Sequence, residues 1–444
     1  MGKNKTAKQL TGQLRILPRN EHNISRKLIS KNALKVLYRL KDGGYDAYLV
    51  GGGVRDILLG LEPKDFDIAT NATPEQIKSL FSNCRLIGRR FRLAHIVFGR
   101  DIIEVATLRG HHDENPNLGK QSEHGQLLRD NVYGTIDEDA ERRDFSANAL
   151  YYNIADYSVI DYWGGLDAIA NRELDLIGDP DTRYREDPVR MLRAIRFAVK
   201  LDMQMTEPTQ APIRQLASLL QNIPKARLFE ECLKLFLAGQ GLATFKLLVE
   251  YQLFQQIFPN LAEPVSDPNS QTYQLICQAL SNTDKRVNNG QRITPAFLFA
   301  AFLWYEVEQA KAHYLAQQIP EHDANFMATS AVLESGQYNV VIPKRFSSTI
   351  REIWLLQSRL EKRAGKRCLK LLENPKFRAG YDFLLLRSQV EQGDLIEKVN
   401  WWTEIQQSDE AQQKVLLAKI GAGESRRTRR RRPPKRRKNQ TNDN

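Results

Sequence analysis

The chain has 444 residues, of which 41% are hydrophobic and 27% charged, and its formal net charge is +12. This balance is typical of a globular protein with a buried core, and the length predicts roughly two to four domains. No apolar run approaches the ~20 residues that span a bilayer, which excludes a membrane-spanning protein, and the polar N-terminus predicts no secretory signal. The four cysteines are scattered, which disfavours a zinc site or disulfide framework and favours a reducing cytoplasm.

The first third of the chain mixes short helix and strand patterns. Residues 1–25 are predicted to form a flexible arm, and apolar residues at helical spacing predict a helix over 24–40 that ends at Gly43-Gly44. Thr73 is predicted to cap a later helix, with Pro74 at its first position. The other expected elements are strands over 45–50, 66–69, 85–87, 95–98 and 102–107 and a short helix over 54–59.

After about residue 177, strand patterns become scarce and apolar residues recur every three or four positions. The predicted fold class is therefore α+β, with a small mixed-sheet head followed by an all-helical neck and body and a disordered basic tail. The predicted parts are an arm over 1–25, a head over 26–160, a neck over 161–245, a body over 246–420 and a tail over 421–444.

The first segment that carries chemistry is 49–70, which reads LVGGGVRDILLGLEPKDFDIAT. Asp65 and Asp67 are two apart at the start of a strand, so both carboxylates face one side while Phe66 points into the core. Such a pair repels unless a cation is present, and oxygen-only ligands suit Mg²⁺. A lone D-x-D is more often a solvated turn, so the hypothesis depends on the neighbouring motifs.

A glycine loop precedes this carboxylate pair. Gly51 and Gly52 follow a strand and precede a helix, an arrangement in which backbone N–H groups approach a phosphate. Arg55, one turn into the helix, adds a charged fork for phosphate oxygens. The loop matches neither G-x-G-x-x-G nor a P-loop, which disfavours a dinucleotide-binding fold and a P-loop enzyme.

A second motif, ERRDF, occupies residues 141–145. On a helix, Asp144 and Asn148 share one face at i,i+4, while Phe145 and Ala149 share the adjoining apolar face. One side of this helix is therefore expected to pack, and the other to present polar groups to a cleft.

A third motif contains Asp187, Arg190 and Arg193, at spacings of three. On a helix these side chains fall on one face. Taken alone, the row is more simply explained as a surface ladder of salt bridges.

These motifs, in this order over residues 45–200, resemble the class II nucleotidyltransferases, which comprise bacterial poly(A) polymerases and CCA-adding tRNA enzymes. The glycine loop with Asp65 and Asp67 resembles the head motif of that family, ERRDF its Arg-Arg-Asp-Phe motif, and Glu186-Asp187 with Arg190 its Glu-Asp-x-x-Arg motif. The resemblance implies a nucleotidyltransferase head, a neck that binds nucleotide and RNA, and a helical body that binds RNA.

The resemblance also implies two-metal phosphoryl transfer, in which Asp65 and Asp67 hold two Mg²⁺ or Mn²⁺ ions and an RNA 3′-oxygen attacks the α-phosphorus of ATP. A third carboxylate is expected, and Asp144 matches the family motif, with Glu104 as its competitor. Asp187 and Arg190 are implied to read the base edge. The full set of implied nucleotide contacts is Gly51, Gly52, Arg55, Arg143, Asn148, Asp187, Arg190 and Arg193.

The choice between the two relatives depends on other segments. Residues 86–96, LIGRRFRLAHI, resemble a stretch particular to bacterial poly(A) polymerases, and so do segments 296–301 and 375–382 of the helical body. Arg89, Arg90 and Arg92 would form a basic loop suited to RNA phosphates, although a solvated turn is an equally simple reading.

The tail carries most of the net charge. Between Arg426 and Lys438 there are ten Lys or Arg and no acid, which leaves +2 on the rest of the chain. Such a run favours electrostatic capture of nucleic acid, and the alternatives are a solubilising tail or attraction to anionic lipids. The candidate RNA contacts in the tail are Arg426, Arg427, Arg429 and Arg430.

The implied function is template-independent addition of AMP from ATP to RNA 3′ ends with release of pyrophosphate, which promotes RNA turnover in the cytoplasm. The expected partners are 3′ ends of mRNA, small RNA and tRNA, the RNA-degradation machinery and, weakly, a membrane surface; DNA is not expected. The first alternative is a CCA-adding enzyme, and the more distant ones are a non-catalytic RNA-binding protein and a hydrolytic phosphatase or nuclease.

Overall fold

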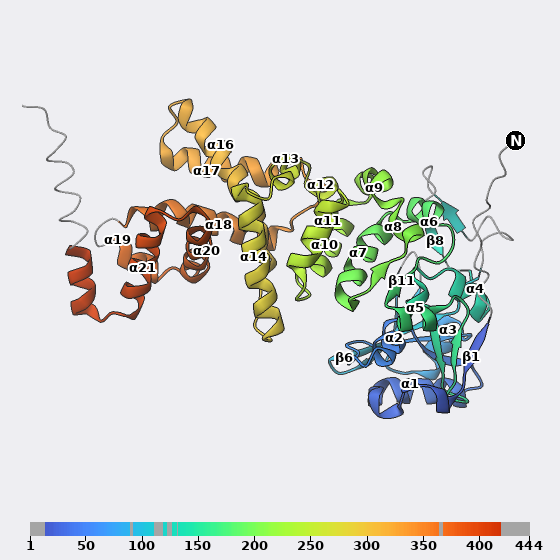
Figure 1. Ribbon diagram of the computed structural model, residues 1–444. Coiled ribbons are helices and arrows are strands. Elements are labelled where there is room, and N and C mark those ends of the chain that lie inside the picture. The colour runs from blue at the N-terminus through green and yellow to red at the C-terminus, as the bar shows by residue number, and fades with distance from the viewer. Residues whose placement is uncertain are drawn as a thin grey trace, which may run out of the picture. The chain divides into compact units, whose positions relative to one another are not determined.

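The computed structural model describes residues 14–88, 92–110, 119–121, 127–130, 132–363 and 367–418 (Figure 1). The chain divides into two compact units, the first made of Met1–Ile223 with Glu250–Gln256 and the second of Pro224–Val249 with Ile257–Asn444. Of the predicted neck, residues 161–223 fall in the first unit and residues 224–245 in the second.

Unit 1 contains an eight-stranded mixed sheet, with the strand order β1-β10-β9-β2-β3-β6-β5-β4. Only β3 and β6 pair in parallel, and all other neighbours in this sheet are antiparallel. The strands are β1 (Arg15–Leu17), β2 (Ala47–Val50), β3 (Asp67–Thr70), β4 (Cys84–Ile87), β5 (Leu93–Phe98), β6 (Asp101–Thr107), β9 (Leu150–Asn153) and β10 (Val159–Asp161). Two-stranded pairs are formed by β7 (Gly119–Gln121) with β8 (Leu127–Asp130) and by β11 (Glu173–Leu174) with β12 (Gln204–Met205).

The central strands bury both faces, because alternate side chains enter different cores. Leu49 and Ile68 pack with the buried face of α1 (Lys31–Asp42), which Ser30 caps. Val50 and Ala69, on the opposite face, pack with Ala140 of α4 (Ile136–Glu141). Asp67 follows the same alternation as Ala69, so the sheet directs its carboxylate to the face opposite α1.

Unit 1 also contains helices, and among them α2 and α3 connect strands of the large sheet. The predicted cap at Thr73 is confirmed, since Thr73 and Gln76 form a capping box at the start of α3. The other helices are α2 (Gly52–Leu58), α3 (Pro74–Leu80), α5 (Gly165–Asn171), α6 (Pro180–Glu186), α7 (Val189–Leu201), α8 (Glu207–Gln210) and α9 (Ile213–Leu216).

The end of the predicted arm differs from the expectation of a loose segment. Residues Arg15–Leu17 form edge strand β1, which pairs with β10, and His22 Nε2 lies 2.9 Å from the carbonyl oxygen of Tyr157. Pairing with β10 satisfies the backbone polar groups on one side of this short strand, and composition alone does not reveal that pairing.

The described part of unit 2 is helical, which confirms the predicted change of character along the chain. Its interior includes a buried ion-pair network in which Arg387 contacts Glu361 and Glu391, with its guanidinium over the Trp304 ring. Within the described residues, no helix is long and apolar enough to cross a membrane. The helices of at least ten residues are α10 (Lys225–Phe236), α11 (Gly241–Glu250), α14 (Gln271–Asn288), α16 (Trp304–Ala316), α17 (Glu321–Glu334), α18 (Lys344–Lys362), α20 (Phe377–Glu391) and α21 (Asp394–Gln407), and the shorter ones include α15 (Pro295–Phe302) and α19 (Arg367–Leu372).

Candidate active site

Three chain segments meet at one end of the large sheet. Asp67 is the first residue of β3 and lies opposite Val50, the last residue of β2, so the glycine loop leaves the sheet beside the carboxylate pair. On the other side of β3, Asp67 is in register with Glu104 of the parallel strand β6. The sheet therefore brings the Asp-x-Asp segment, Gly51 and Glu104 together.

The charges at this end of the sheet are mostly negative. Desolvation, followed by the neighbouring charges of Glu104 and Asp65, raises the pKa of Asp67 to about 6, although the charge of Arg143 opposes this shift. Asp65 and Asp67 are both exposed, and the Glu104 side chain is 48% exposed, with its Oε1 3.3 Å from His95 Nε2. These three carboxylates remain accessible, and the described groups that offset their charge include Arg143 near Asp67 and His95 beside Glu104.

Oxygen donors with excess negative charge are what a hard divalent cation requires, so these residues fit Mg²⁺ or Mn²⁺ in their chemistry. Among the described residues, no three His, Cys, Asp or Glu side chains are already gathered closely enough to hold an ion. These residues therefore match a divalent cation in the type of donor atom, in charge and in strand register.

Asp144 lies in a different environment. Its carboxylate accepts from Arg193 Nε at 2.7 Å, from the Phe145 backbone N–H at 2.9 Å and from Asn148 Nδ2 at 3.1 Å. Burial alone would raise the pKa of Asp144, but the Arg193 charge and the hydrogen bonds from Asn148 and Arg193 outweigh it and hold this pKa well below its usual range. Asp144 is thus satisfied by protein groups.

The prediction that Asp144 and Asn148 lie on one α-helix was wrong. Phe145 is extended and forms a bridge with Leu176, and only a 3₁₀ turn follows, over Ser146–Asn148. The contact between Asp144 and Asn148 that the spacing predicted is nevertheless present.

Arg55 is buried, with only 3% of its side chain exposed. Its Nε donates to Asp56 Oδ1 at 2.8 Å, its Nη1 donates to Asn148 Oδ1 at 2.5 Å, and its guanidinium lies over the Phe197 ring. Two residues predicted to contact nucleotide, Arg55 and Asn148, therefore bond to each other. In this arrangement Arg55 joins α2 to the turn at Asn148.

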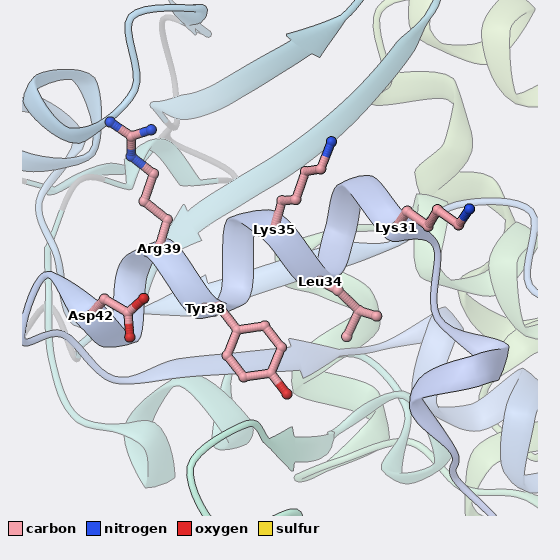
Figure 2. Close-up of a pocket in the computed structure, with 6 residues that line it drawn as sticks. All are labelled: Lys31, Leu34, Lys35, Tyr38, Arg39 and Asp42. Carbon is pink, nitrogen blue, oxygen red and sulfur yellow. The ribbon is translucent and has the colours of Figure 1, made fainter.

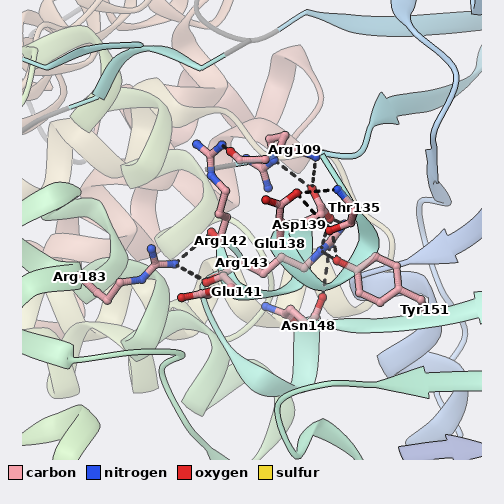
Figure 3. Close-up of polar contacts among 11 residues, drawn as sticks. Arg109, Thr135, Glu138, Asp139, Glu141, Arg142, Arg143, Asn148, Tyr151 and Arg183 are labelled. Atoms are coloured by element: carbon pink, nitrogen blue, oxygen red, sulfur yellow. Dashed lines mark hydrogen bonds and ion pairs between the residues drawn. The ribbon is translucent and has the colours of Figure 1, made fainter. Parts of the chain in front are cut away.

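Arg143 is held by a buried carboxylate that the sequence analysis missed (Figure 3). Asp139 Oδ2 accepts from Arg143 Nε at 3.1 Å and Nη2 at 3.0 Å, and from the Tyr151 hydroxyl at 2.7 Å. Burial opposes ionisation, but Arg143 and Arg109 lower the pKa of Asp139 to about 2. The i,i+4 spacing of Asp139, on α4, and Arg143, just beyond the end of α4, is a signal that could have identified this pair.

Gly51 lies close to the same arginine. Its φ is +66°, a conformation that favours glycine, and a Cβ there would lie 3.4 Å from Arg143 Nη1. The glycine loop and Arg143 are therefore neighbours, as the predicted nucleotide site requires.

Asp187, Arg190 and Arg193, which were predicted to share one face of a helix, do not all lie on a single helix. α6 ends before Asp187, whose Oδ1 accepts from the Val189 N–H at the start of α7. Pro188 explains the break, since the residue before proline is disfavoured in the helical region. Arg190 contacts Glu186 at 2.9 Å, and Arg193 contacts Asp144, so neither is a free surface cation.

Arg92 is the one residue of the predicted basic loop that the structure describes, and it contacts Glu75 at 2.5 Å. Arg89 and Arg90 lie outside the described residues, as do Arg426, Arg427, Arg429 and Arg430. The predictions that these side chains contact RNA remain predictions.

A hollow over α1 contains none of the predicted site residues (Figure 2). Lys31, Lys35 and Arg39 follow one side of the helix, and Leu34 and Tyr38 line the other. Because α1 covers the opposite face of the sheet, this hollow is separate from the carboxylates.

Solved structures identify the fold. The Bacillus stearothermophilus CCA-adding enzyme in complex with CTP matches with a TM-score of 0.56 at 23% identity, over 85% of this chain and 81% of that one. A tRNA nucleotidyltransferase complexed with a primer tRNA and an ATP analog also matches with a TM-score of 0.56 and 23% identity, over 84% of this chain and 98% of that one. The fold is that of the CCA-adding class of nucleotidyltransferases.

Sequence relatives narrow this class. Poly(A) polymerase I of Escherichia coli O157:H7 is 53% identical over 94% of this chain and 91% of its own length, and that of Haemophilus influenzae is 51% identical over 89% of each. The CCA-adding enzyme of Geobacillus sp. strain WCH70 is 37% identical over only 50% of this chain and 54% of its own length. The chain belongs to the bacterial poly(A) polymerase family.

Family models match three parts of the chain. They are described as the poly A polymerase head domain over residues 47–175, a probable RNA and SrmB-binding site of polymerase A over 202–263, and the polymerase A arginine-rich C-terminus over 317–438. The first match covers the carboxylates, the glycine loop and the Arg143–Asp144 segment.

Proposed function

We propose that this protein transfers AMP from ATP to the 3′ ends of RNA without a template and releases pyrophosphate. The observation that carries the proposal is the register of Asp67 and Glu104 on adjacent parallel strands, beside Asp65 and the glycine loop. The mostly negative charge there distinguishes this end of the sheet from the neutralised carboxylates around it.

The proposed metal ligands are Asp65, Asp67 and Glu104. A bound Mg²⁺ or Mn²⁺ supplies charge neutralisation at the triphosphate and a lowered pKa for the attacking hydroxyl. Glu104 replaces Asp144 as the third carboxylate, since Asp144 already accepts from Arg193 and two further donors. Asp144 instead fixes the position of Arg193.

The remaining residues bind the nucleotide in this proposal. The backbone N–H groups of Gly51 and Gly52 face the phosphates, with Arg143 beside them. Asp187 and Arg190, at the junction of α6 and α7, read the adenine edge. Arg55 acts indirectly, by holding Asn148.

RNA is the proposed acceptor, with 3′ ends of mRNA, small RNA and tRNA as substrates, and the activity promotes RNA turnover with the RNA-degradation machinery. Relatives named poly(A) polymerase I match along nearly the whole chain, whereas CCA-adding enzymes match about half of it, which supports AMP as the repeated addition. A cytoplasmic location agrees with four free cysteines.

One extension assay tests the proposal. The protein is incubated with Mg²⁺, each of the four labelled nucleoside triphosphates in turn, and either an unstructured oligoribonucleotide or tRNA lacking its 3′ end. We expect many A residues on the oligomer and little use of CTP. Addition that stops after C-C-A on tRNA, with no extension of the oligomer, would establish the CCA-adding alternative.

A further inference from the structure

Arg183 of α6 makes contacts to which no role has so far been given (Figure 3). Its Nη2 donates to the backbone carbonyl oxygens of Glu141 at 3.5 Å, Arg142 at 3.0 Å and Arg143 at 2.5 Å. Its Nη1 donates to Glu186 Oε2 at 3.1 Å. A single guanidinium thus joins α6 to the backbone of the segment that carries Arg143.

These carbonyls occupy a place where a cation is favoured. They lie at the C-terminal end of α4, where carbonyl oxygens lack intrahelical partners and the helix dipole is negative. The Arg183 side chain is only 14% exposed, and burial, followed by the charge of Arg190, lowers its pKa to about 10. A charge held under these conditions depends on its partners.

Arg183 also contacts the residues proposed to read the base. Its own backbone carbonyl accepts from Arg190 Nη1 at 2.7 Å, and Glu186 accepts from both Arg183 and Arg190. Its side chain therefore holds the Arg143 segment while its backbone and Glu186 hold Arg190. Arg193 provides a second connection, from α7 to Asp144.

We propose that Arg183 is a positioning residue that sets Asp187 and Arg190 at a fixed separation from Arg143, and thereby adapts the site to ATP. The inference rests on the proposed function. Arg183 itself touches no substrate. Its removal deletes one of the two described connections between the parts of this nucleotide site, and leaves the carboxylates on β3 and β6 in place.

The test compares Arg183→Ala and Arg183→Lys with the unaltered full-length protein. For Arg183→Ala we expect the KM for ATP to rise about tenfold, the preference for ATP over CTP to fall by a similar factor, and kcat to change less. Lysine keeps the charge but lacks the planar fork, in which one nitrogen donates to the carbonyls and the other to Glu186, so Arg183→Lys is expected to fall between the two. Guanidinium ion in the assay should partly restore Arg183→Ala.

Arg185 provides a matched control. It is an arginine of the same helix, 56% exposed, and it pairs only with Asp181 among the contacts described. Arg185→Ala is expected to leave KM, kcat and nucleotide preference unchanged. Thermal unfolding of each variant, and hydrogen exchange of the amides in residues 141–148 of Arg183→Lys, show the effect on the backbone when the alanine variant folds poorly.

Two outcomes would overturn the inference. One is an unchanged KM and nucleotide preference in both Arg183 variants. The other is a parallel loss of kcat and unfolding temperature with preference unaltered, which a purely structural role would produce. Extension by the unaltered protein tests the proposed function separately, because the inference depends only on ratios between variant and unaltered protein.

Discussion

Unit 1 contains carboxylates in two different environments. At the start of β3, Asp67 lies in register with Glu104 of β6 and two residues from Asp65, and the pKa of Asp67 is raised to about 6. Around α4, Asp139 and Asp144 are surrounded by guanidinium and amide donors, and both pKa values are lowered. Carboxylates that remain accessible are available to an external cation, whereas carboxylates paired with arginine and amide donors hold parts of the chain together.

This contrast assigns roles that residue type alone does not. Asp144 belongs to a recognisable motif, yet its partners make it part of the framework that holds Arg193. Glu104 belongs to no motif, yet its register places it beside Asp67. The contrast can be tested by changing one member of each group.

The largest effect is expected at the Asp-x-Asp pair. Changing Asp65 or Asp67 to Ala should lower AMP transfer by several orders of magnitude, because metal-dependent phosphoryl transfer depends on these oxygens. Circular dichroism should show an intact fold. Extension of RNA by Asp65→Ala at more than about a tenth of the normal rate would contradict the assignment.

The next prediction distinguishes the two candidates for the third carboxylate. Glu104→Gln should lower the extension rate by about 100-fold, equivalent to about 2.7 kcal/mol of transition-state stabilisation, with little change in unfolding temperature. The Gln side chain keeps the shape but loses the charge that a metal requires. A Glu104→Gln variant with full activity would favour Asp144 as the third metal-binding carboxylate.

Asp144→Asn should affect stability instead. It removes the partner of Arg193, whose side chain is 34% exposed, so the expected loss is about 2 kcal/mol, below the value for a fully buried pair. Urea unfolding measures this loss. Normal stability together with a collapse of activity would place Asp144 among the metal ligands.

The two environments should also respond oppositely to pH in metal-free protein. The folded pKa of Asp67, about 6, lies above the unfolded value of 3.8, so ionisation of Asp67 destabilises the folded state. This destabilisation has its full value above pH 6 and disappears as the pH falls toward 4. Asp139, with a pKa of about 2, stabilises above pH 4 and loses this contribution as pH falls toward 2.

In EDTA at pH 7.5, Asp67→Asn should therefore unfold at a higher temperature than the unaltered protein. The expected gain in the free energy of unfolding is on the order of 1 kcal/mol after solvent screening. The difference should vanish near pH 4. An Asp67→Asn protein that is less stable at pH 7.5 would show that Asp67 is paired like Asp139.

Deleting residues 426–444 should have the smallest effect on turnover, since neither group of carboxylates lies there. If four or five of the cationic side chains contact RNA, the slope of log affinity against log salt should flatten by roughly 3 units. Turnover at saturating RNA should stay nearly constant. An unchanged affinity and slope would favour a solubilising tail.

The sequence predicted the elements whose signals are local. The alternation around Phe66, the glycine loop and the Thr73 cap depend on neighbours along the chain, and Phe66 packs against the core as expected. The turn after Asp144 could not be predicted, because a bridge from Phe145 to Leu176 replaces helical hydrogen bonding. The burial of Arg55 likewise depends on Asn148, which is distant in sequence.

The parallel pairing of β3 with β6 has a consequence for folding. Because parallel strands need a crossover, Asp67 and Glu104 meet only when the chain that separates β3 from β6 in sequence, which forms α3, β4 and β5, has folded back to pair these strands. A slip of one residue in β6 would turn Glu104 to the opposite face and bring an apolar neighbour beside Asp67. Recovery of catalytic activity during refolding should therefore follow the late, long-range closure of this sheet rather than the early formation of helices.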